Sequence, residues 1–123
     1  MTKSLVPDLA KPCFLYRFEI YIPVTDNDGD LITPAKFDRL TEKLTTLFGG
    51  VSTNYPYGGS GGIDGMWYSS ITQLLHRDHS AVVMVLTKDE NDSIDYFKTN
   101  LPKWEKEFKQ EKILIVFHRV QTF

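Results

Sequence analysis

Residues 49–67 read GGVSTNYPYGGSGGIDGMW, and this glycine-rich segment separates two stretches of different pattern. Seven of the chain's eight glycines lie between positions 49 and 65. An amphipathic, helix-like pattern precedes the segment, and apolar, strand-like runs follow it. Glycine adopts turn conformations without steric strain. We therefore expect residues 49–65 to form a loop that joins a helix to a strand.

A strand and a helix are predicted before this loop. Residues 14–22 are rich in aromatic and β-branched side chains, as strands are, and apolar residues occupy every second position. Thr33 and Pro34 are typical of a helix N-cap and first turn. From there to Phe48, apolar residues recur every three or four positions. Gly49 then supplies the left-handed conformation that ends a helix.

Two strands and a second helix are predicted directly after the loop. A strand over residues 66–75, broken near its middle, should pair with the run at 81–86. That run is apolar on both faces, so we expect it to lie at the centre of the sheet. Asn91 and Asp92 are the predicted start of a helix, which Pro102 should kink or split.

Residues 112–120 form the last predicted strand, so the order is strand, helix, strand, strand, helix, strand. This order predicts an α+β fold of the ferredoxin-like type, in which two helices cover one face of an antiparallel sheet. At 123 residues the chain has the size of one domain. We place that domain at residues 13–123. Residues 1–12 lack periodicity and contain two prolines, so we interpret them as a tail.

Five short motifs carry a resemblance to a known group of proteins. They are a Pro-x-x-x-x-x-Gly turn at 23–29, Gly-Gly-Val-Ser at 49–52, Gly-x-Trp at 65–67, the acidic Asp78 at the start of a strand, and Phe-x-Gln-Glu at 108–111. In their order, over residues 14–118, the chain resembles a group of small uncharacterised bacterial domains of unknown function. The resemblance implies a ferredoxin-like fold and brings no catalytic residue. The glycine-rich connection is shorter in that group, and residues 55–62 lengthen it here.

The composition argues against several classes of protein. The net charge of −2 argues against a dedicated nucleic-acid binder, which normally has a basic surplus. No stretch approaches the roughly 18 consecutive apolar residues of a membrane helix. Cys13 is the single cysteine, so no intrachain disulfide can form, which fits a reducing compartment. We expect a cytoplasmic protein with no cofactor, no nucleic-acid partner and no membrane partner.

Candidate ligand-binding residues come from four places in the chain. They are Arg17 and Glu19 on the polar side of the first strand, Tyr55, Tyr57 and Trp67 in the glycine-rich segment, His76, Asp78 and His79 before the central strand, and His118 in the last strand. Histidine and aspartate are metal ligands, but alternate residues of a strand point to opposite faces, so His76 and His79 would diverge and we expect no metal site. A phosphate loop is excluded because the glycines follow a helix and lack a lysine.

Three functions remain open at this point, and the one ranked last is an inhibitor or accessory protein of a mobile element that presents Tyr55 and Tyr57 to a partner. The first is a ligand-binding or protein-interaction domain that forms a homodimer, because two helices leave one face of the sheet without cover. The second is a small enzyme, a hydrolase or isomerase of an anionic metabolite, that uses the polar sheet face and the cluster at residues 76–79. The glycine-rich segment is either a connection or a lid whose Tyr55 and Tyr57 offer stacking surfaces.

Overall fold

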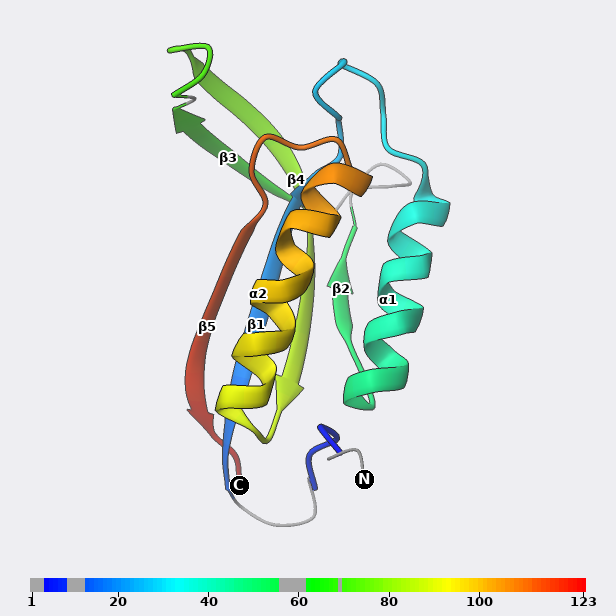
Figure 1. The fold of residues 1–123 in the computed structure, drawn as a ribbon, viewed down its shortest axis with the longest axis vertical. Helices are drawn as coiled ribbons and strands as arrows, with labels where there is room; N and C mark the ends of the chain where they lie inside the picture. The colour runs from blue at the N-terminus through cyan, green and yellow to red at the C-terminus, as the bar shows by residue number, and fades with distance from the viewer. Residues whose placement is uncertain (1–3, 9–12, 56–61, 69) are drawn as a thin grey trace.

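A computed structural model describes residues 4–8, 13–55, 62–68 and 70–123. The chain has an α+β fold, in which an antiparallel sheet of five strands carries two helices on one face (Figure 1). In chain order the elements are β1 (Phe14–Pro23), α1 (Pro34–Phe48), β2 (Ser52–Asn54), β3 (Ile63–Tyr68), β4 (Leu75–Thr87), α2 (Glu90–Glu107) and β5 (Leu114–Gln121). The predicted helices and the strands at both ends of the chain are therefore present.

The sheet has the order β2-β4-β1-β5, and β3 also pairs with β4. Ser80 of β4 lies opposite Pro23 of β1 on one side and Ile63 of β3 on the other. β3 therefore follows β2 along the same edge of β4. This arrangement is loosely ferredoxin-like, but it is not strictly that fold, because the segment after α1 supplies two short strands where the prediction has one.

β4 is longer than its apolar middle predicts. It begins at Leu75 and contains residues 76–79, which pair with β3 as a hairpin that extends beyond the helices (Figure 1). The prediction of a strand at 71–74 is wrong, because the described part of that stretch is a turn in which Gln73 has a φ of 59°. Ile71 and Leu74 are exposed there, so their apolar character reflects no core position.

α2 differs from its prediction at the start and in the middle. The N-cap is Asp89, whose carboxylate accepts a hydrogen bond from the backbone N–H of Asp92 at 2.8 Å. The helix is one element through Pro102, so the predicted split there is wrong, while the alternative, a kink, stays a prediction. Proline removes the hydrogen bond to the carbonyl four residues earlier, that of Lys98. Because both residues are exposed, water can satisfy that carbonyl and the helix continues.

The hydrophobic core lies between the sheet and the two helices. Its buried residues include Phe18, Ile20 and Ile22 from β1, Phe37, Leu40, Leu44 and Phe48 from α1, Val83 and Val85 from β4, and Phe97, Trp104 and Phe108 from α2 and its C-terminal end. The predicted alternation of β1 and the three- and four-residue spacing of α1 both place these side chains inward. Residues 4–8, the described part of the predicted tail, form an N-terminal arm. Its Leu5 joins this core, and its Val6 contacts Gly49 at the end of α1.

Candidate functional site

The sheet face opposite the helices brings several candidate residues together, and we call it the open face. It consists of Leu15, Arg17, Glu19 and Tyr21 from β1, Val82, Met84 and Leu86 from β4, and Leu114, Val116, His118 and Val120 from β5. These residues alternate along each strand with the residues that face the core. Arg17 of the central strand lies between Leu86 and His118 in the register, so three of the candidates, Arg17, Glu19 and His118, share this face.

A short polar column runs along β1 in the middle of the open face. The Nε atom of Arg17 lies 3.2 Å from Oε1 of Glu19, and the Tyr21 hydroxyl donates a hydrogen bond to Oε2 at 2.5 Å. The hydrogen bond to Glu19 and burial raise the pKa of Tyr21 above its usual value. The Glu19 carboxylate is therefore held from both sides, and its side chain is only 14% exposed.

The Arg17 guanidinium has N–H donors that Glu19 does not use. Its Nε atom is buried, and its contact with Glu19 has the distance of an ion pair without the angle of a hydrogen bond. Among the described residues, Glu19 is its one ion-pair partner. A guanidinium has five N–H donors, so donors remain for another acceptor.

Apolar side chains flank this column on both neighbouring strands. Val82 of β4 lies opposite Tyr21 on one side, and Leu114 of β5 lies opposite it on the other. Leu114 and Val116 remain 50% and 36% exposed, because both helices lie on the other face of the sheet (Figure 1). Exposed apolar groups that adjoin one another are typical of an interaction surface.

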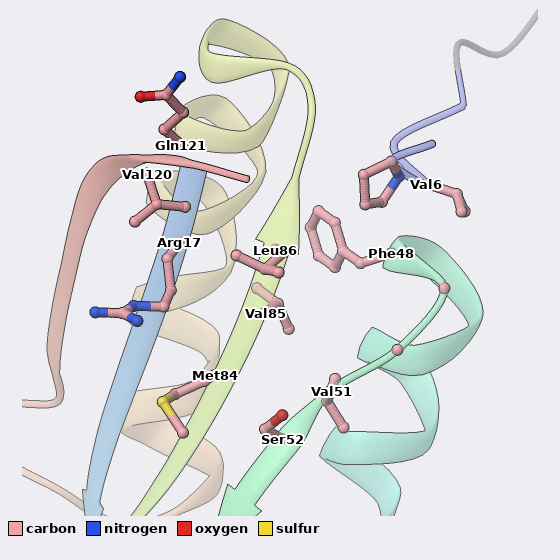
Figure 2. A pocket seen from close by; sticks show the side chains of 13 residues that line it. Val6, Arg17, Phe48, Val51, Ser52, Met84, Val85, Leu86, Val120 and Gln121 are labelled. Carbon is pink, nitrogen blue, oxygen red and sulfur yellow. The ribbon is translucent and has the colours of Figure 1, made fainter. Parts of the chain in front are cut away.

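A cavity of about 600 Å³ lies at one end of the open face (Figure 2). It forms where the pairing of β2 with β4 stops at Ser52 and Met84, because residues 49–51 turn away toward the end of α1. The cavity is lined by Val6 and Pro7 of the arm, Arg17, residues 48–52, residues 84–86, Val120 and Gln121. Its lining combines an apolar wall with one charged side chain, Arg17, among the described residues.

The aromatic candidates lie away from the open face or outside the described side chains. Tyr55 packs against the core side, with its ring centre 5.4 Å from that of Phe37 and its hydroxyl donating to the Phe37 carbonyl at 3.4 Å. Burial raises the pKa of the Tyr55 hydroxyl. Tyr57 lies outside the described residues. Trp67 lies in β3 opposite His76, and its side chain is outside what the structure describes.

The histidine cluster lies in the β3–β4 hairpin, apart from Arg17. Asp78 lies opposite Gly65, and Nδ1 of His79 lies 2.6 Å from Oδ1 of Asp64. His79 shares the strand face of the core residues, whereas Arg17 belongs to the open face. Seven residues separate His79 from the position opposite Arg17, which is about 23 Å along a strand. These candidates therefore do not form one site.

The described residues also bear on metal binding and on membrane association. The described residues contain no group of three histidine, cysteine, aspartate or glutamate side chains arranged to hold a metal ion. Neither described helix combines the length and the apolar character that a membrane-spanning helix needs. Comparison with family profiles, curated proteins and solved structures finds no match for this chain. The case for a function therefore depends on the open face and its cavity.

The residues that sequence reasoning missed are the apolar ones around Arg17. Met84 and Leu86 belong to a run that is apolar on both faces, which indicates a central strand and does not reveal which neighbours complete a cavity. Val120 is the last residue of the final predicted strand, and no pattern there indicates a cavity. The alternation of β4 does indicate two of these residues. Its odd-numbered residues face the core, so the even-numbered Met84 and Leu86 must lie on the opposite face of the sheet.

Proposed function

We propose that the protein is a small non-catalytic interaction domain that forms a homodimer through the open face. The observation that carries this proposal is the exposed apolar surface that β5 presents beside the polar column. Leu114 and Val116 are exposed on β5, and no described helix covers this face. Packing two such faces together removes that apolar area from water, at about 25 cal/mol for each Å².

The arrangement of charge on the open face suits association of two identical copies. Arg17 and Glu19 lie two residues apart on the same strand, so the column has a positive end and a negative end. In a dimer with two-fold symmetry the same patch meets itself in reverse, and residue i of one copy contacts residue j of the other. Arg17 of each copy then faces Glu19 of the second copy, while the apolar flanks meet one another.

The proposal is tested by placing a charge on the open face and an equal charge elsewhere. Leu114→Arg puts a cation on the flank of the column, and Leu31→Arg is the matched control in the exposed connection before α1, where Leu31 is 64% exposed. Sedimentation velocity over a concentration series should show the dimer for the native chain and for Leu31→Arg. Leu114→Arg should sediment as a monomer with an unchanged far-UV spectrum. Equal behaviour of the two variants contradicts the proposal.

One observation favours the second function, that of a small hydrolase or isomerase. His79 is held by the Asp64 carboxylate at 2.6 Å, and both side chains are exposed. A carboxylate that orients an imidazole is a recurring part of general acid–base sites. This function predicts hydrolysis or isomerisation that falls in His79→Ala and partly in Asp64→Asn. Equal rates for the native chain and His79→Ala, measured on ester and phosphoester substrates, exclude it.

A further inference from the structure

We infer that the cavity beside Arg17 binds a small carboxylate with an apolar body. The cavity measures about 600 Å³, within the roughly 300–1,000 Å³ of small-molecule sites. It is formed by one chain, and because the proposed dimer would engage Arg17 with Glu19 of the second copy, the inference concerns the monomer. It also goes beyond self-association, because it assigns a ligand class to one end of the open face.

The apolar part of the site has contributions from four segments of the chain. Met84 and Leu86 of β4 and Val120 of β5 line the cavity from the two sides of β1, and Phe48 at the end of α1 lies between β4 and the N-terminal arm (Figure 2). Val51 completes this wall before β2 begins. Such a surface takes up an aliphatic chain or an aromatic ring by excluding water from both partners.

The polar part of the site is Arg17. Figure 2 shows its guanidinium on the β5 side of β1, with Met84 and Leu86 on the other side of the strand. A carboxylate accepts two parallel hydrogen bonds from a guanidinium, which gives the contact both strength and direction. The Arg17 side chain is 41% exposed, so the guanidinium N–H groups other than the buried Nε can donate to a ligand.

Backbone and hydroxyl groups add further polar contacts at the same place. Pairing of β2 with β4 stops at Ser52 and Met84, so the edge of β4 at Val85 and Leu86 has no strand partner among the described residues. The Ser52 hydroxyl belongs to the lining. A ligand whose apolar body fills the slot and whose carboxylate reaches Arg17 therefore meets groups of matching character along its length.

The test compares octanoate with 1-octanol, which has the same chain length and no charge. Each is titrated into the ¹⁵N-labelled chain carrying Leu114→Arg, a monomer if the dimer proposal holds, and amide shifts are followed. Octanoate should bind at least about tenfold more tightly than the alcohol, the equivalent of about 1.4 kcal/mol. The largest shifts should fall at Ser52, Leu86 and Val120. Equal affinities for the two compounds, or shifts elsewhere, overturn the inference.

Three variants separate the charge from the cavity. Arg17→Met keeps the volume of the side chain and should weaken octanoate binding about tenfold while leaving 1-octanol unchanged. Arg119→Met is the matched control, because Arg119 lies over the Phe14 ring, away from the cavity, and should bind octanoate normally. Ser52→Trp places an indole ring in the cavity, at a position in β2 where a strand tolerates an aromatic residue. This variant should bind neither compound. Unaltered octanoate binding by Arg17→Met or Ser52→Trp contradicts the site.

Discussion

Gly49 gives a sharp test of how the N-terminal arm is held at the end of α1. It has a φ of 90° in the left-handed region, and a Cβ at this position would lie 2.7 Å from Cγ1 of Val6. Gly29 is a matched site, with a φ of 85° and no atom within 4 Å of such a Cβ. The two glycines therefore share the backbone penalty of substitution, and only Gly49 adds a collision.

The magnitudes follow from these two terms. A left-handed residue other than glycine costs about 1–2 kcal/mol, and the lower entropy of the unfolded alanine chain returns about 0.4–1 kcal/mol. Gly29→Ala should therefore lose about 1 kcal/mol of unfolding free energy. Gly49→Ala also displaces Val6 and disturbs the buried Leu5, whose full burial is worth about 1.5–3 kcal/mol. We expect a total loss of about 2 kcal/mol, because Val6 is exposed and the arm can move part of the way.

Urea unfolding followed by circular dichroism measures these differences in the native chain and in a Val6→Ala background. Removing the two Cγ atoms of Val6 eliminates the closest contacts, so Gly49→Ala should then cost no more than Gly29→Ala. Equal losses for the two glycine variants in the native background would refute the contact between the arm and α1. So would a difference that persists in Val6→Ala.

Two further predictions concern the helices and a buried tyrosine. Asp89→Ala should lower the unfolding free energy by about 1 kcal/mol, because the Asp89 carboxylate caps α2. Thr33→Ala should lower it by less, because Thr33 makes no side-chain hydrogen bond at the start of α1. Equal losses of stability for the two variants in thermal unfolding contradict this prediction. Burial raises the pKa of Tyr96 above 10.0, so folding favours the neutral phenol, and the stability this contributes is complete below pH 10 and lost as the pH rises through the raised pKa. Tyr96→Phe should reduce the loss of unfolding free energy above pH 10. It should leave the unfolding free energy at pH 7 unchanged, because the buried hydroxyl has no hydrogen-bond partner among the described residues. A loss of stability above pH 10 that is equally steep in Tyr96→Phe argues against this prediction.

Much of the fold could be predicted because local pattern and tertiary burial agree in several elements. Alternation in β1 puts Phe18, Ile20 and Ile22 in the core, and Gly49 ends α1 in the left-handed conformation that glycine allows. The pairing of β3 with β4 was predicted, but with residues 81–86 in place of 75–80, because backbone pairing, rather than apolar burial, holds the polar start of β4. Exposed residues such as Ile71 then gave a strand-like pattern with no core behind it.

The candidate site was predictable only in part. Arg17 lies opposite His118 because the first and last strands are neighbours in the sheet. The sequence also predicts that the sheet face carrying Glu19 is not covered by a helix. The separation of Arg17 from His79 could not be seen, because it depends on the register and the full length of β4. The cavity arises where one short strand stops pairing, at Ser52, and no local sequence pattern marks that point.

The proposed dimer pairs the open face with itself through Arg17 and Glu19. Arg17→Glu leaves the column wholly negative, and Glu19→Arg leaves it wholly positive, so each variant alone should repel its own copy. Light scattering should give each variant the 14.2 kDa mass of one chain, and a dimer for the native protein. Mixing the two variants in equal amounts should restore twice the chain mass, because opposite columns now meet. If the mixture keeps the mass of a single chain while both variants remain folded, the account of the open face is wrong.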